Sequence, residues 1–257
     1  KIIRWTQPEI LLYDDDPYVR MSYPDLVEEN GDYYVTETQK DVARVHKIDT
    51  GFLELLWQQF DLKEVAKKGL KLSLGEKDGK LQESATMPGL PKFVDRDRKR
   101  KDYGTKQLRT GFSLEVWFQL ESLEPLQVLL DNRNESGKGF ALVTTATGTI
   151  EIILNDGRTE NRWDCDPGLI KADTLHHLVV TVDAGPHIIT FVVDGKLCDG
   201  ADHRQFGWGR FSPNLRDVNG NKTLRIGPDL IGQIKSLRVY DRCLLTSEAI
   251  GNYKDGL

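Results

Sequence analysis

Two glycine-containing segments of this 257-residue chain combine a tryptophan with arginine and side-chain amides: residues 155–164 (NDGRTENRWD) and 206–214 (FGWGRFSPN). Sugar-binding sites use this combination, an apolar ring with planar hydrogen-bonding groups beside it. A guanidinium also grips a carboxylate in a bidentate fork, which favours acidic sugars. The alternative is that the tryptophans pack these segments onto the protein core. The segments predict six carbohydrate-binding residues: Asn161, Arg162, Trp163, Trp208, Arg210 and Asn214.

A third polar segment, residues 131–135 (DNRNE), is rich in side-chain oxygens. Calcium takes six to eight oxygen ligands, so Asp131, Asn132 and Asn134 are candidate calcium ligands. An ordinary polar turn is the alternative. Residues 14–16 (DDD) are a second candidate calcium site, with weaker support from the surrounding sequence.

The sequence contains none of the common catalytic motifs. Its five histidines form no HxH or HExxH pattern, and no GxSxG, P-loop or dinucleotide fingerprint occurs. His176 and His177 are neighbours in a predicted strand, so their side chains point to opposite faces and cannot easily bind one metal ion. The three cysteines allow either one disulfide with a free thiol or three buried thiols. They are Cys165, Cys198 and Cys243.

Composition and charge exclude several classes of partner. Lys and Arg number 35 against 40 Asp and Glu, a net charge of −5 that gives no reason to expect nucleic acid. Residues 95–102 (DRDRKRKD) are locally basic, but their carboxylates favour a solvated loop. No apolar run approaches the ~20 residues that a membrane helix needs. Because the chain starts at Lys1, we expect it to be a piece of a longer protein, and the missing signal peptide says nothing about export.

A hairpin at residues 178–195 (LVVTVDAGPHIITFVVDG) is the clearest predicted element. Its two β-branched runs are almost continuously apolar, which indicates strands covered on both faces. Such a pair needs further strands beside it. We predict these at residues 70–74, 112–120, 128–130, 140–144, 149–154, 223–226 and 233–240, followed by one helical turn at 246–250 capped by Thr246. Many short strands with few helices predict an all-β sandwich or jelly roll.

The N-terminal region predicts a separate small sheet. Residues 10–13, a hairpin at 26–35 with an Asn-Gly turn, and residues 42–48 suggest about four antiparallel strands. A short helix follows, capped by Asp49 or Thr50. Residues 75–106 turn polar and are expected to form an irregular loop. We therefore divide the chain into residues 1–62, a blade-like sheet plus helix, and 63–257, the sandwich. Aromatic residues of the first part, Trp5 among them, are expected to bury against the second.

Several pieces of the sequence resemble, in order and spacing, laminin-G-like, concanavalin A-like lectin/glucanase domains: residues 112–118 (FSLEVWF), 139–142 (GFAL), 175–183 (LHHLVVTVD), 193–196 (VDGK), 224–227 (LRIG) and 232–242 (GQIKSLRVYDR). The resemblance covers residues 110–253 and implies a concanavalin A-like jelly-roll sandwich. These are core and turn residues, so they identify no ligand. Leu175 stands where the family commonly has a tryptophan. The E-x-D-x-x-E strand motif of the related glucanases is absent around Glu115 and Glu151, so we expect no catalysis in the sandwich.

Residues 20–28 (RMSYPDLVE), with 34–37 (YVTE), resemble the last blade of a sialidase-like β-propeller glycoside hydrolase. In sialidases a tyrosine matching Tyr23 is the nucleophile, although here Pro24 follows it rather than the usual serine. The arginine cluster and acidic residues of the other blades are absent from this sequence, and one blade cannot assemble a site drawn from several. Tyr23 is therefore expected to be structural, and the rest of a propeller is an expected partner.

The combined prediction is a non-catalytic carbohydrate-binding module from the C-terminal part of a larger extracellular glycoside hydrolase, with a glycan, favoured to be acidic, as ligand. Two alternatives stay open: a fragment of an active sialidase-like glycosidase, and a structural brace that binds no sugar. An extracellular or periplasmic location follows from the family resemblance alone.

Overall fold

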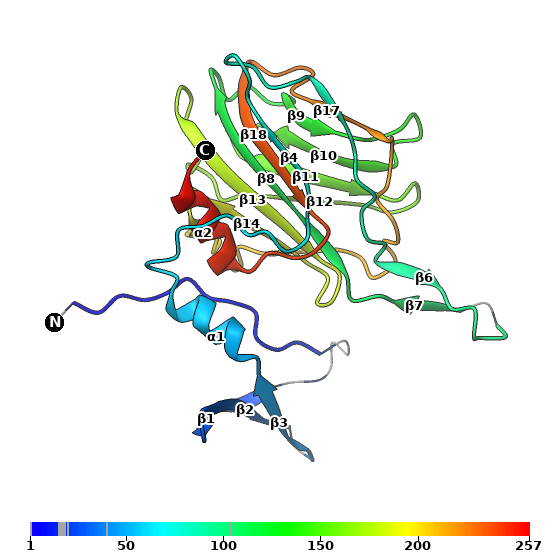
Figure 1. Cartoon of the computed structure of the whole chain (residues 1–257). Helices are drawn as coiled ribbons and strands as arrows, with labels where there is room; N and C mark the ends of the chain where they lie inside the picture. The colour runs from blue at the N-terminus through cyan, green and yellow to red at the C-terminus, as the bar shows by residue number, and fades with distance from the viewer. Residues whose placement is uncertain (1, 15–18, 20, 40, 103) are drawn as a thin grey trace.

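The computed structural model describes residues 2–14, 19, 21–39, 41–102 and 104–257. Its main body is a sandwich of two antiparallel sheets that lie face to face (Figure 1). The first sheet has seven strands in the order β15-β14-β13-β8-β18-β4, with β16 also paired to β14. Their bounds are β4 Leu70–Gly75, β8 Gly111–Leu120, β13 Leu175–Asp183, β14 Ile188–Val193, β15 Lys196–Leu197, β16 Gly209–Arg210 and β18 Gly232–Tyr240.

The second sheet has six strands in the order β12-β11-β10-β9-β17-β5. Their bounds are β5 Ser84–Thr86, β9 Val128–Asp131, β10 Gly139–Thr144, β11 Ile150–Asn155, β12 Glu160–Asp164 and β17 Thr223–Ile226. The apolar core lies between the two sheets and joins, for example, Phe118 of β8 to Phe140 and Leu142 of β10. The arrangement confirms the predicted all-β sandwich.

The predicted central hairpin is the pair β13–β14, and it is buried on both faces as expected. Val180 and Phe191 face the core between the sheets. Val179 and Val192, which point the opposite way, pack under helix α2, Thr246–Asp255. Covering both faces explains why the two runs are almost continuously apolar.

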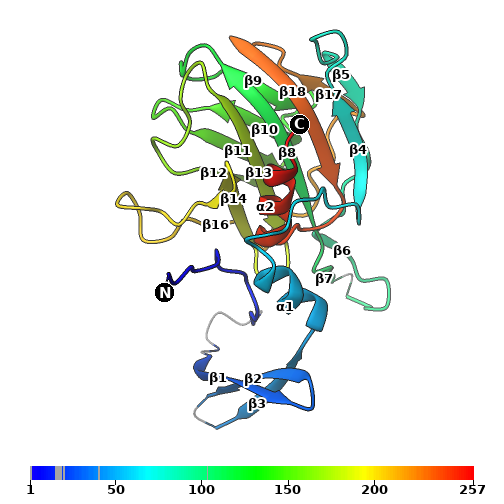
Figure 2. The same cartoon turned by 60° about the vertical axis from the view of Figure 1, so that its left-hand side comes forward.

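Helix α2 is longer than predicted, because it continues for ten residues where one turn was expected. Thr246 is its first helical residue, and Leu245 takes the N-cap position instead. Gly251 and Asn252 argue against a helix interior. Here tertiary contacts outweigh that propensity: the Asn252 amide donates to Glu115 Oε2 (2.6 Å) and to the Tyr240 hydroxyl (3.0 Å). Figure 2 shows α2 lying against the outer face of the seven-stranded sheet.

The expectation of an irregular loop over residues 75–106 was wrong in part. Strand β5 extends the six-stranded sheet, and Val94–Arg96 (β6) pairs with Thr105–Gln107 (β7). Met87, Leu90 and Phe93 belong to the main core, and Phe93 is 1% exposed. These apolar residues are isolated in a polar stretch, so no periodic pattern identified them.

The N-terminal sheet has three strands rather than about four: β1 Ser22–Glu29, β2 Asp32–Thr38 and β3 Ala43–Ile48. Asn30 and Gly31 both have positive φ (55° and 84°), as the predicted type I′ turn requires. Helix α1, Thr50–Trp57, follows, and the Asp49 carboxylate accepts from the Phe52 amide as its N-cap. Val35, Ile48 and Leu53 form a separate small core between this sheet and α1.

Residues 10–13 form no strand; with residues 7–9 they make an extended segment, the strap (residues 7–13), that runs beside α2 and the seven-stranded sheet. Gln7 and Glu9 hold it: the Leu197 amide donates to Gln7 Oε1 (3.3 Å), and Glu9 caps α2. Trp5, which was expected to be buried, is 85% exposed. Among the described residues, none of the helices has the length and apolar character needed to cross a membrane.

Candidate functional site

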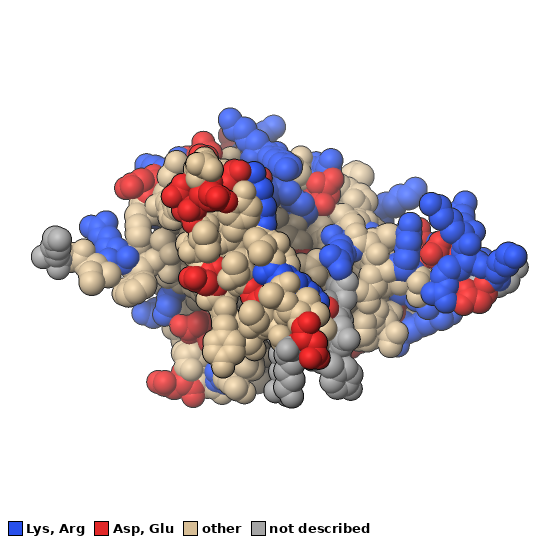
Figure 3. All heavy atoms as spheres, turned by 90° about the horizontal axis from the view of Figure 1, so that it is seen from below, with Lys and Arg blue, Asp and Glu red and all other residues tan. Residues whose placement is uncertain are grey.

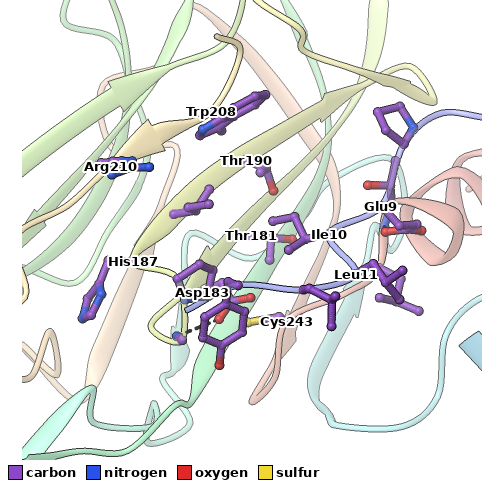
Figure 4. Close-up of a pocket in the computed structure, with 18 of the residues that line it drawn as sticks. Glu9, Ile10, Leu11, Thr181, Asp183, His187, Thr190, Trp208, Arg210 and Cys243 are labelled. Carbon is purple, nitrogen blue, oxygen red and sulfur yellow. Dashed lines mark hydrogen bonds between the residues drawn. The ribbon is translucent and has the colours of Figure 1, made fainter. Parts of the chain in front are cut away.

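A cavity of about 870 Å³ lies between the strap and the outer face of the seven-stranded sheet, beside the N-terminus of α2. Strands β13 and β14 form its floor, and the strap forms one wall. In Figure 4, Trp208 and Arg210 lie on one side, Glu9, Ile10 and Leu11 lie on the other, and Thr190 and Thr181 lie between. Its size suits a small ligand such as one or two sugar rings.

The floor carries polar groups because two threonines interrupt otherwise apolar strands. Thr181 of β13 is the cross-strand partner of Thr190 of β14, so the two side chains share the outer face. In the next row, Asp183 pairs with Ile188, and Ile188 pairs with Arg210 of β16. Hydroxyl, carboxylate and guanidinium groups therefore alternate with apolar surface across the cavity floor.

Trp208 and Arg210 face the cavity because Gly209 faces the other way, as alternation along a strand requires. A Cβ atom at position 209 would lie 2.3 Å from the ring of Trp163, so only glycine allows this close approach. Trp208 is 38% exposed, and its ring centroid lies 4.6 Å from that of Phe206. The pair forms an exposed aromatic surface at the cavity edge.

Trp163 is packed into the fold instead. Its indole N–H donates to the Gly207 carbonyl (3.1 Å), and the Arg204 guanidinium lies 4.1 Å from its ring centroid. Arg204 is in turn held by Asp164 and Asp166 at 2.9 and 3.1 Å. The ring thus has protein groups on its edge and on its faces, and it anchors the 204–209 loop to β12.

The other predicted sugar-binding residues do not line the cavity. Asn161 Oδ1 accepts from the Ser212 amide (2.8 Å), so Asn161 ties the 206–214 loop to β12. Arg162 points to the opposite face of β12 and pairs with Glu160 (2.8 Å) and Glu151 (3.2 Å). Asn214 is exposed, beyond the cavity-lining Pro213. The structure therefore brings together only Trp208 and Arg210 of the six.

Three carboxylic acids line the cavity, Glu9, Asp14 and Asp183, and each has a protein partner. Asp14 pairs with Arg44 at 3.0 Å. Burial raises the pKa of Glu9 above its ordinary value, although Ser247 and Thr246 donate to the carboxylate and oppose the shift. Burial also raises the pKa of Asp183, which accepts from the Gly185 amide at 2.9 Å. The Cys243 thiol also lines the cavity, and burial followed by the nearby Asp183 raises its pKa well above the ordinary value.

The candidate calcium ligands are already committed to protein partners. Arg133 and Arg225 both donate to the Asp131 carboxylate, at 2.9 and 2.6 Å. Burial alone would raise the pKa of Asp131, but the Arg133 hydrogen bonds and charge outweigh it and lower that pKa. Asn132 Oδ1 accepts from the Phe140 amide, and Asn134 Oδ1 from the Lys138 amide. In the described part of the chain, no three His, Cys, Asp or Glu residues group as a metal site would need. Asp15 and Asp16 of the weaker acidic candidate lie outside the described residues.

The adjacent histidines point to opposite faces of β13, as predicted. His176 Nδ1 lies 2.7 Å from Asp194, whereas His177 Nε2 lies 3.1 Å from Glu115 under α2. All three cysteines are free thiols, and Cys165 and Cys198 are buried. Burial raises the pKa of Cys165 to about 12. The two histidines and Cys165 do not line the cavity, whereas Cys198 and Cys243 do.

Sequence reasoning missed most of the cavity. Glu9 and the other strap residues carried no local signal, because their partners lie more than 200 residues away in sequence. A signal for the floor was present: Thr181 and Thr190 are the polar residues within two apolar runs, at positions that pair across the hairpin.

Comparison with known proteins gives one family match. A family model described as Laminin_G_3, concanavalin A-like lectin/glucanases superfamily, matches residues 101–250. The search of curated proteins found no match.

Several solved structures of botulinum neurotoxin binding domains are distantly similar. The serotype D binding domain is 15% identical with a TM-score of 0.48, over 73% of this chain and 52% of that one. The serotype C1 binding domain is 14% identical with a TM-score of 0.47, over 71% and 51%. A binding domain of neurotoxin DC in complex with SialylT is 14% identical with a TM-score of 0.45, over 71% and 50%. The chain thus spans about half the length of these structures.

Proposed function

The chain belongs to the concanavalin A-like lectin/glucanase superfamily, and we propose that it is a non-catalytic carbohydrate-binding module. The observation that carries the proposal is the cavity with Trp208 and Arg210 on one side and paired threonine hydroxyls on its floor. An exposed aromatic ring packs on the apolar face of a sugar, and hydroxyl and guanidinium groups bind its oxygens. The fold itself hosts many functions, so the proposal rests on this site.

Binding is proposed rather than hydrolysis because the three cavity carboxyls, Glu9, Asp14 and Asp183, all have structural partners. Glycosidases need a pair of carboxyls free to donate and accept protons at the glycosidic bond. Glu9 accepts three hydrogen bonds at the N-terminus of α2, from the Thr246 amide and from the amide and hydroxyl of Ser247. A general acid or a nucleophile at Glu9 would break this cap.

Arg210 gives the site its preference for acidic sugars. It is exposed and lines the cavity, and a guanidinium binds a sugar carboxylate bidentately. Single modules of this kind bind weakly, with dissociation constants in the micromolar to millimolar range, or about −4 to −8 kcal/mol.

The test is a glycan array followed by calorimetry. Trp208→Ala is expected to weaken binding at least tenfold, about 1.4 kcal/mol, because the aromatic surface is lost. Trp5→Ala is the matched control, since Trp5 is 85% exposed and lies outside the cavity. Equal glycan affinity in wild type and Trp208→Ala would show that the cavity is not the glycan-binding site. Failure to bind any glycan on the array would favour the structural brace.

The proposal also includes a parent protein of the glycoside hydrolase class, placed outside the cell or in the periplasm. It rests on the resemblance of residues 20–37 to a sialidase-like blade. Propeller blades have four strands, and the sheet described here has three. Tyr23 is 86% exposed with a φ of 51°, so it lies on an open surface. The encoded residues that precede Lys1 decide the matter: further blade-like repeats would support the parentage, and a signal peptide directly upstream would exclude it.

A further inference from the structure

Residues 92–109 concentrate positive charge on an otherwise acidic chain. They hold eight Lys and Arg against three Asp, a net charge of +5, whereas the other 27 basic and 37 acidic side chains give the rest of the chain −10. We call this segment the basic hairpin (residues 92–109), because β6 and β7 form its two strands. In Figure 3 its Lys and Arg side chains gather on the right of the molecule, over the projecting β6–β7 pair of Figure 1.

Most of these cations are available to a ligand. Five of them are exposed and have no acid within ion-pair distance among the residues that the structure describes: Lys92, Arg98, Lys99, Lys101 and Lys106. Of the other three, Arg100 pairs with Asp102, and Arg96 and Arg109 also have interaction partners. A stripe of unpaired cations attracts an anion over a distance of about 8 Å at physiological ionic strength.

The base of the hairpin is fixed to the sandwich beside the cavity. Phe93 is 1% exposed, and its ring centroid lies 5.4 Å from that of Phe211, which lines the cavity. At the other strand, Gln107 itself lines the cavity. The Arg109 guanidinium lies 5.5 Å from the ring of Tyr13, a strap residue that also lines it. The basic surface is therefore continuous with the cavity rim.

We propose that the ligand is a polyanionic glycan chain, with one or two sugar rings in the cavity and the adjoining sulfated or uronate sugars on the basic hairpin. This inference rests on the proposed function, whose cavity it extends. A chain of charged sugars fits because a single polymer then satisfies both Arg210 and the hairpin cations.

A nucleic acid fits the surface less well. Duplex DNA carries one negative charge about every 1.7 Å of axis, so it needs a broad basic surface. The cavity also gives the glycan a site that a duplex cannot enter.

The experiment compares two triple variants that remove equal charge. Arg98→Gln/Lys99→Gln/Lys101→Gln neutralises the hairpin tip, and Lys63→Gln/Lys67→Gln/Lys68→Gln neutralises three exposed lysines elsewhere. Binding to heparin, to desulfated heparin and to a short DNA duplex is measured by calorimetry across a salt series. The hairpin variant is expected to bind heparin at least tenfold more weakly, with the slope of log K against log salt reduced by about two. The control variant is expected to keep most of the affinity.

Trp208→Ala separates this inference from the proposed function. Weaker heparin binding in both Trp208→Ala and the hairpin variant supports one continuous site. A second outcome is that Trp208→Ala weakens binding of an array glycan, while the hairpin variant binds both that glycan and heparin as wild type does. The proposed function of the cavity then stands, and the inference about the basic hairpin fails. If heparin binding depends on the basic hairpin and not on Trp208, the proposal of one continuous site is overturned. Equal affinity for the DNA duplex and heparin overturns the assignment to glycan.

Discussion

Trp163 on β12 and Trp208 beside β16 lie on opposite sides of Gly209, and their surroundings differ. Trp163 donates a hydrogen bond to the loop backbone and lies under the Arg204 guanidinium. Trp208 is 38% exposed at the edge of the cavity. Both come from segments with glycine, arginine and amides. The difference teaches that Trp163 fixes the position of the loop so that Trp208 can face the cavity.

This division of roles follows from backbone alternation and one close contact. Gly209 lets β16 approach the ring of Trp163, and the residues on either side, Trp208 and Arg210, then point to the cavity. Asn161 adds a second tie through the Ser212 amide. Trp208 and Arg210 are therefore held in place by β12, a strand that contributes no residue to the cavity lining.

The largest expected effect separates the two tryptophans by stability. Trp163→Ala should lower the free energy of unfolding by about 3 kcal/mol, because it removes a packed ring and a hydrogen bond. Trp208→Ala should cost less than about 1 kcal/mol, since the ring is partly solvated. Chemical denaturation of the two variants checks this. Equal losses would show that the two residues do not differ in role.

A smaller effect is expected at the contact between the two segments. Gly209→Ala places a methyl group 2.3 Å from ring atoms of Trp163, so β16 must move away from β12. We expect a loss of about 2 kcal/mol of stability together with weaker glycan binding, because Trp208 and Arg210 move with the strand.

Gly157→Ala is not a suitable control for that variant because of its positive φ of 90°. Gly89→Ala is suitable, since nothing lies within 4 Å of a Cβ atom there and its φ is not positive. Gly89→Ala should keep both stability and binding close to wild type. Wild-type glycan affinity in Gly209→Ala would contradict the role given to this contact.

The sequence predicted the sandwich well because its signals are local. The turns at Asn30-Gly31 and Asp194-Gly195 both show the positive φ angles that these residue pairs favour. The β13–β14 runs also had the apolar pattern of strands covered on both faces. These features depend on neighbours in sequence, so pattern reasoning finds them.

The candidate site was harder to predict because its determinants are distant in sequence. Trp163 is packed by Arg204 and Gly209, more than 40 residues later, so its segment alone could not reveal a structural role. Glu9 caps a helix that begins at Thr246. Helix α2 itself was predicted too short because Asn252, a poor helix former, is held there by Glu115.

The smallest expected effect concerns the strap, which forms the cavity wall facing Trp208 and does not contribute to the packing of Trp163. Burial raises the pKa of Glu9 above 4.5, against the hydrogen bonds from Ser247 and Thr246. A carboxyl with a raised folded-state pKa binds protons more readily in the folded state than in the unfolded state. Its contribution to the free energy of unfolding therefore rises as the pH falls from neutral through the folded pKa towards 4.5, and is lost as the pH rises again.

Glu9→Gln removes this titration, so the difference in unfolding free energy between wild type and Glu9→Gln should shift in favour of wild type as the pH is lowered through that window. The shift should stay under about 1 kcal/mol, the usual size of a charge effect at a helix N-terminus. Denaturation at a series of pH values measures it, with Glu64→Gln, an exposed carboxyl, as the control. A difference that does not change with pH would mean that Glu9 is not buried at the end of α2, and the wall of the cavity opposite Trp208 would then be open.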